Sequence, residues 1–143
     1  MAGRIEHDIV NGLIEICRDG AQGFRQAADS VADPELKRIF IDTARRREVY
    51  AAELLPFARS LGVDGTARGA WHRRWMAVKD VLTDHDESSV LAEAIRGELA
   101  AAAVYAGALV SMLPPNARPI VQRQHDEIRG VLGELNEFAL PCI

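Results

Sequence analysis

The stretch PELKRIFIDTARRREVYAAELLPFARSL, residues 34–61, predicts a long amphipathic helix. Its apolar residues recur every three or four positions, the spacing that places them on one face of an α-helix. Asp33 suits the N-cap, Pro34 suits the first helical position, and Gly62 suits the C-terminal stop. The apolar seam reads Leu36, Phe40, Thr43, Arg47, Tyr50, Leu54, Phe57 and Leu61. Arg47 is the residue that breaks this seam badly, and it lies near the midpoint of the helix.

The same spacing predicts three more long helices, over residues 4–31, 88–112 and 116–139, and a short helix over residues 70–82. The short helix and the glycine-rich loop before it make a long connection between the second and third long helices. Such a crossover favours the ferritin-like topology over a simple up-down-up-down bundle. We therefore expect a single all-α domain over residues 1–143, a ferritin-like antiparallel four-helix bundle with the short helix in its long crossover.

Two further polar residues interrupt apolar seams near the middle of a helix, Glu98 in the third long helix and Gln124 in the fourth. In an antiparallel bundle both lie level with Arg47. We predict a structural polar layer in which Arg47 pairs with Glu98 and with Glu15 or Asp19, and Gln124 satisfies the remaining hydrogen bonds. Buried charges are tolerated when they are paired. Such a layer fixes helix register more than it adds stability, as a buried asparagine does in coiled coils.

A metal site is the alternative interpretation, since ferritin-like proteins hold two iron ions at this level. A di-iron carboxylate site takes a Glu from each of two helices and a Glu-x-x-His motif from each of the other two. No Glu of this chain is followed three residues later by His. Arg47 also adds a permanent positive charge that would repel Fe²⁺, so we expect no cofactor. An irregular iron or manganese site would use Glu15, Glu53, Glu98, Glu127 and His125.

The composition argues against several classes of partner. A chain of 143 residues suits one domain, and its net charge of −4 does not favour a nucleic-acid backbone. No apolar run approaches the roughly 20 residues of a membrane-spanning helix. The two cysteines, Cys17 and Cys142, have no metal-ligand or redox spacing, which favours a reducing cytoplasm. Cys17 is expected in the core as a small apolar residue.

Several short blocks occur together, in order, along the chain. They are Leu13-Ile14-Glu15-Ile16-Cys17-Arg18-Asp19-Gly20 with Gly23-Phe24, Asp33-Pro34-Glu35-Leu36-Lys37, Gly69-Ala70-Trp71-His72-Arg73 with Trp75-Met76 and Lys79, Arg96-Gly97-Glu98, and Arg123-Gln124. Together they resemble a bacterial family of ferritin-like four-helix-bundle domains of unknown function. The resemblance runs from Asn11 to Arg129 and implies the bundle fold, a context in stress physiology and no particular activity. The chain departs from the family pattern at Leu132 and Gly133, where members typically carry a His-Asp pair.

Three classes of function remain open, and we favour a non-catalytic bundle that acts by association. The chain has no Ser-His-Asp, Cys-His or phosphate-loop signature. The expected partner is a second copy, giving a homodimer, or another protein. Apolar residues left on the surface, such as Val10, Ile14, Val104 and Val110, would support this class.

The other two classes use the bundle interior. One is a ferritin-like metal protein or oxidase. The other is a carrier of a small ligand, with a cavity near Gly20, Gly23 and the alanine run of residues 100–103. The basic and aromatic segment Trp71–Lys79 is expected to dock on the bundle in preference to a membrane surface or a partner.

Overall fold

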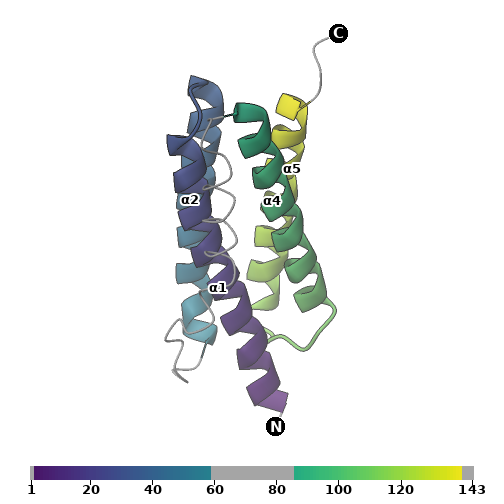
Figure 1. Ribbon diagram of the computed structural model, residues 1–143. Helices are drawn as coiled ribbons and strands as arrows, with labels where there is room; N and C mark the ends of the chain where they lie inside the picture. Colours follow the sequence, from purple (N-terminus) through teal and green to yellow (C-terminus); the bar gives the residue numbers. More distant parts are fainter. Residues whose placement is uncertain (1, 59–85, 140–143) are drawn as a thin grey trace.

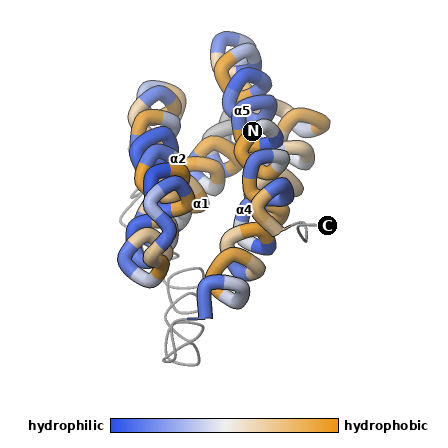
Figure 2. Tube along the Cα trace, turned by 90° about the horizontal axis from the view of Figure 1, so that it is seen from above, coloured by the Kyte–Doolittle hydropathy of each residue, from blue (hydrophilic) through white to orange (hydrophobic). Residues whose placement is uncertain are grey.

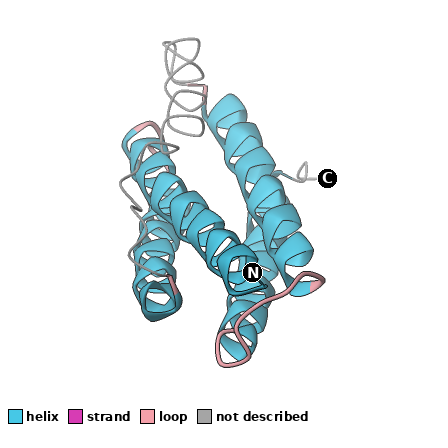
Figure 3. Ribbon diagram, turned by 90° about the horizontal axis from the view of Figure 1, so that it is seen from below, coloured by secondary structure: helices cyan, strands magenta, loops and turns pink. Residues whose placement is uncertain are grey.

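The computed structural model describes residues 2–58 and 86–139, which fold into four long helices that pack against one another (Figure 1). The elements are α1 (Ala2–Asp29), α2 (Pro34–Leu54), the 3₁₀ turn η1 (Leu55–Phe57), α4 (Glu87–Leu109) and α5 (Arg118–Ala139). Within these two ranges no strand is present (Figure 3). The prediction of an all-helical fold is confirmed for this part of the chain.

The helices pack as two pairs, α1 along α2 and α4 along α5. The pairs meet through α1 against α4 and α2 against α5, and a view from above separates them clearly (Figure 2). Figure 1 shows the N-terminus and the α4–α5 connection at one end of the bundle, and the α1–α2 turn at the other. Each helix therefore has two neighbours and an outer face.

Capping side chains set the first residues of α2 and α4. The Asp33 carboxylate accepts hydrogen bonds from the backbone amides of Glu35 (2.9 Å) and Leu36 (3.1 Å), while Pro34 fills the first turn. These are amides that have no partner within the helix itself. Asp86 caps α4 in the same way, through the Ser88 amide at 3.1 Å. The predicted start of α2 is thus confirmed.

Several helix ends differ from the predicted ones. Helix α1 spans residues 2–29 where 4–31 was predicted, and α4 begins one residue before the predicted start. Helix α2 ends at Leu54 and gives way to η1, because Pro56 has no amide hydrogen and its ring clashes with the preceding turn. Helix α4 ends at Leu109, not at residue 112, which leaves Met112 exposed beyond it. Helix α5 begins at Arg118, two residues after the predicted start. The predicted helix 70–82, the docking of Trp71–Lys79 and Cys142 lie outside the described residues.

Two apolar clusters fill the interior, one on either side of the middle of the bundle. The first includes Val10, Leu13, Ile14, Cys17, Leu54, Tyr105 and Val121. The second includes Phe24, Ala27, Phe40, Ala44, Leu91, Val131 and Leu135. Between them along the helices lie the buried side chains of Arg47 and Glu98, whereas the buried Gln124 lies within the first cluster, between Val121 and Ile128.

The expectation that Val10 and Ile14 lie on the surface is wrong, since both are fully buried. Helix α1 packs against α2 and also against α4, so its buried stripe is wider than a single seam. Val104 and Val110 are exposed, as predicted, and Cys17 is a buried core residue, as predicted.

Candidate functional site

An ion pair between Arg47 of α2 and Glu98 of α4 occupies the middle of the bundle. The two side chains are only 2% and 0% exposed. Arg47 Nη1 also donates to the backbone carbonyl of Ile16 on α1 at 3.5 Å, and the guanidinium carbon lies 5.9 Å from the centre of the Phe24 ring. Burial raises the pKa of the Glu98 carboxyl above its usual value, although the adjacent Arg47 opposes that rise. Through these contacts the Arg47 guanidinium joins α2 to α4 and α1.

The pairing of Arg47 with Glu98 is incomplete. Arg47 Nε and Glu98 Oε2 are both buried, and neither has a hydrogen-bond partner. A buried donor or acceptor without a partner costs on the order of 1–3 kcal/mol. A buried ion pair with such unsatisfied atoms is therefore not expected to add net stability.

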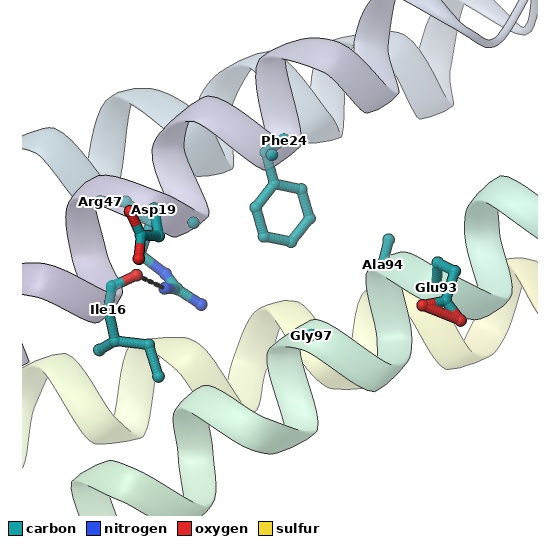
Figure 4. A pocket seen from close by; sticks show the side chains of 9 residues that line it. Ile16, Asp19, Phe24, Arg47, Glu93, Ala94 and Gly97 are labelled. Atoms are coloured by element: carbon teal, nitrogen blue, oxygen red, sulfur yellow. Dashed lines mark hydrogen bonds between the residues drawn. The ribbon is translucent and has the colours of Figure 1, made fainter. Parts of the chain in front are cut away.

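Gly20 of α1 makes room for the guanidinium. A Cβ atom at this position would lie 2.6 Å from Arg47 Nη1, closer than such atoms approach in proteins. Beside it, a pocket of about 30 Å³ is lined by residues of α1, α2 and α4. Figure 4 shows Arg47 in this pocket, with Asp19 and Phe24 on α1 and Gly97 on α4 around it. That volume holds on the order of two water molecules, which is small for a carried ligand.

Gln124 of α5 belongs to a second buried network. Its side-chain oxygen accepts from the Tyr105 hydroxyl at 2.6 Å, and its amide nitrogen donates to the Tyr50 carbonyl (3.3 Å) and to Glu53 (3.0 Å). The Cys17 sulfur lies 3.0 Å from the same Tyr105 oxygen. Since the Tyr105 proton is given to Gln124, the Cys17 thiol is the donor to Tyr105. Burial raises the pKa of both the Cys17 thiol and the Tyr105 phenol, so both stay protonated at neutral pH.

The network continues to the surface through charged side chains. Arg123 of α5 bridges Glu53 of α2 at 2.5 Å and Glu127 of its own helix at 3.2 Å. The Tyr50 hydroxyl donates to Glu127 at 2.6 Å. Partial burial alone would raise the pKa of Glu53, but hydrogen bonds from Arg123 and Gln124 outweigh it and hold that pKa below its usual value.

The structure thus divides the residues singled out from the sequence. Arg47 and Glu98 form the ion pair, and Asp19 is buried and lines the pocket beside Arg47. Gln124 is buried but joins the tyrosine network, and Glu15 is half-buried and not ion-paired with Arg47. Of the two α1 carboxylates that the sequence left open, Asp19 is the one that lines the same pocket as Arg47.

The donors of the alternative metal site do not fit a di-iron centre. Glu98 is held by Arg47, whereas Glu53 and Glu127 share Arg123 nearer the surface. His125 is half-buried, and its Nδ1 has no hydrogen-bond partner. Across residues 2–58 and 86–139, no group of three or more His, Cys, Asp or Glu side chains is placed to hold a metal ion. Because Arg47 occupies the layer and is paired with Glu98, this donor set is not that of a di-iron site.

Three residues of the network were not singled out from the sequence, namely Tyr50, Tyr105 and Arg123. A signal was present for the two tyrosines, because each lies on an otherwise apolar seam. A buried phenol normally finds a hydrogen-bond partner for its hydroxyl, so each predicts a polar neighbour on a facing helix. Arg123 was named from the sequence only in the Arg123-Gln124 block of the family resemblance, and its position beside the seam does not predict a partner.

The fold and this layer define a four-helix bundle with a buried polar network at mid-height. In the part of the chain that the structure describes, no helix is long and apolar enough to cross a membrane. The chain belongs to the family described as Domain of unknown function (DUF2383), whose match covers residues 6–111. A comparison with curated proteins found no match. The family match includes Arg47 and Glu98 and ends before α5, which carries Gln124.

Proposed function

We propose that this protein is a non-catalytic, ferritin-like antiparallel bundle that acts in the cytoplasm by association with itself or with another protein. In this proposal the mid-bundle layer is structural and takes the place of a di-iron site. The observation that carries the proposal is the buried ion pair of Arg47 with Glu98. The stress-related context stays an expectation from the family resemblance.

Electrostatics supports a structural layer over a metal site. A divalent cation bound to Glu98 would share the layer with a guanidinium that is never deprotonated. A metal on Glu98 Oε2, the oxygen that Arg47 leaves without a partner, would lie on the same carboxylate as the guanidinium and be repelled by its charge. Displacing Arg47 from Glu98 instead would leave an uncompensated buried charge, which costs on the order of 3–5 kcal/mol. Two other carboxylates of the alternative site, Glu53 and Glu127, are engaged by Arg123.

The position of the pair supports a role in helix register. It lies between the two apolar clusters, so sliding one helix by a turn would place Arg47 or Glu98 among apolar side chains without its partner. A bundle with the wrong helix register would then contain a buried charge without its partner, which raises its free energy. Coiled coils use a single buried asparagine to the same end.

Metal content is the experiment that tests the proposal. Untagged protein grown with iron and manganese supplied is measured by inductively coupled plasma mass spectrometry, beside the variant Glu98→Gln. We expect far less than one metal ion per chain in both proteins, and no rise in melting temperature when Fe²⁺ or Mn²⁺ is added, since a bound metal would stabilise the folded state. Near-stoichiometric metal in the wild type that is lost in Glu98→Gln would overturn the proposal.

A further inference from the structure

Helix α4 carries a second apolar stripe, on the side that faces away from the core. We call it the outer seam; at spacings of three and four it comprises Ala92, Ile95, Leu99, Ala103, Ala106 and Val110. Leu99 is 52% exposed and Val110 is 88% exposed. From Leu99 to Ala117 the sequence has no charged residue. A helix that is apolar all round is normally covered on all sides.

The outer face of α2 shows what a solvated face of this bundle looks like. It carries Arg38, Asp42, Arg45, Arg46 and Glu48, with Arg38 paired to Asp42 and Glu48 paired to Arg25. The α2 face also carries the exposed Ile41 and Val49 among these charges. On α4 the exposed Arg96, paired with Glu93, lies at the edge of the outer seam, and no charged residue follows it along the helix after Glu98. The outer seam is therefore the longer uninterrupted apolar stripe of the two.

The outer seam has a hollow at one end and protruding side chains at the other. Near the start of α4 lies a groove of about 380 Å³. Its lining is apolar except for Ser88 and Arg96, and comprises Ser88, Leu91, Ala92, Ile95, Arg96 and Leu99 of α4 with Phe138 and Ala139 of α5. Beyond the end of α4, Val110 and Met112 protrude, and the side chains between are the small Ala103 and Ala106. A two-fold axis would bring each hollow against the other copy's protruding end.

We propose that the outer seam binds a second copy of this chain, with the two α4 helices running in opposite directions about a two-fold axis. An axis level with residue 101 places Val110 of one copy opposite Ala92 of the other, in the groove. The same axis places Leu99 opposite Ala103, so that large side chains meet small ones. Small residues on facing helices let the backbones approach closely, and the contact is made twice by symmetry.

The charges at the two ends of α4 favour this opposite orientation. The helix begins with Asp86, which caps it, and Glu87, which accepts from the backbone amides of Ala32 and Asp33, and the exposed Arg118 lies just beyond its other end. Arg118 already donates to the carbonyls of Leu109 (2.6 Å) and Ser111 (2.9 Å), which fixes its position there. Two copies in opposite directions bring the acidic turn of each towards Arg118 of the other, whereas parallel copies would bring like charges together. A second copy therefore complements both the apolar middle and the charged ends.

The oligomeric state tests this interface, which rests on the association part of the proposed function. Sedimentation equilibrium is run on the wild type, on Leu99→Glu and on the control Val49→Glu. Val49 is 54% exposed, like Leu99, but lies on the charged outer face of α2. We expect a wild-type dimer, an unchanged Val49→Glu dimer, and a dissociation constant raised about 30-fold or more by Leu99→Glu, as for a central contact residue.

Thermal unfolding of both variants checks that the bundle itself is intact. A wild type that is monomeric at about 100 µM, far above the nanomolar-to-micromolar range of stable dimers, would overturn the interface. So would equal dimerisation of Leu99→Glu and Val49→Glu. If the protein is a metal-free monomer, the interface is wrong but the proposed function can still hold through association with another protein. If the protein is a dimer with stoichiometric metal, the proposed function is wrong but the interface holds.

A disulfide tests the register of the two copies. In a background with Cys142→Ser, the double variant Ala92→Cys with Val110→Cys is oxidised, and each single variant serves as a control. Buried Cys17 takes no part. We expect a covalent dimer from the double variant alone, because each new cysteine faces the other position across the axis. Equal crosslinking of the single variants, or none of the double variant, would overturn the two-fold arrangement.

Discussion

Removing Arg47 alone should damage the protein more than removing Arg47 and Glu98 together. In Arg47→Leu the Glu98 carboxylate stays in a site where it is 0% exposed, with no opposite charge. Breaking a buried pair in this way costs on the order of 3–5 kcal/mol. In Arg47→Leu with Glu98→Leu both charges are gone, and the two atoms that now lack hydrogen-bond partners disappear with them. Such an apolar replacement is often neutral or stabilising by about 1–4 kcal/mol.

The assay is a double-mutant cycle of the wild type, the two single leucine variants and the double variant, followed by thermal and urea unfolding. For a chain of this size, a loss of about 3–5 kcal/mol lowers the melting temperature by roughly 6–20 °C. We expect that loss in Arg47→Leu and a melting temperature at or above that of the wild type in the double variant. A double variant no more stable than Arg47→Leu would refute the reasoning, because the stranded carboxylate would then not be the cause.

The pH dependence supplies an independent check of the same cause. The pKa of Glu98 is already raised by burial, and loss of Arg47 removes the charge that opposes the rise. A carboxyl group whose pKa is higher in the folded state binds its proton more tightly there, so its favourable contribution is present at low pH and is lost as the pH rises through the folded pKa. The loss in free energy of unfolding of Arg47→Leu relative to the wild type should therefore become smaller as the pH falls from neutral towards 5. An equal loss of stability at both pH values would contradict the idea that an unpaired Glu98 carboxylate is the cause.

Three further outcomes follow from the site. Gly20→Ala should destabilise the protein, because the added Cβ would lie 2.6 Å from Arg47 Nη1. Gly12→Ala is the control: a Cβ at that position has nothing within 4 Å, so this replacement within a helix should stabilise the protein by about 0.5–1 kcal/mol. Urea unfolding compares the two variants. Cys17 should resist alkylation in the folded protein and react on unfolding, since burial raises its pKa; peptide mass spectrometry measures this. Because the pKa of Glu53 is lowered from 4.5, its contribution to stability is present above that pH and lost below it, so Glu53→Gln should flatten the acid limb of the stability curve.

The helices were predicted mainly from two signals, the capping residues and the spacing of apolar residues. Asp33 and Pro34 fixed the start of α2, because a carboxylate beside free amides and a proline in the first turn each satisfy a local need. The end of α2 was placed too far along, because the seam continues past Pro56 and periodicity does not register a missing amide. Local chemistry therefore outweighs hydrophobic spacing at the ends of a helix.

The ion pair of the site could also be predicted, since Arg47 and Glu98 each interrupt a seam at mid-helix and each requires a charged partner. The place of Gln124 could not. The position of a residue in a seam predicts its height along the bundle and that its side chain faces the core. It does not predict which of the neighbouring helices the side chain contacts. The Tyr105 hydroxyl reaches Gln124 from α4, and Glu53 reaches it from α2, so its hydrogen bonds are used there.

The layer is built from features that each lower stability. Gly20 costs about 1 kcal/mol in a helix interior, two buried polar atoms lack partners, and two charges are removed from water. We propose that its benefit lies in specifying one arrangement of the helices, because a helix that slides by one turn separates Arg47 from Glu98. The double leucine variant should accordingly keep its melting temperature and lose uniqueness. We expect doubled or broadened amide signals in its ¹H–¹⁵N correlation spectrum, compared with a single sharp set for the wild type. A double variant with one sharp set of signals would show that apolar packing alone fixes the register.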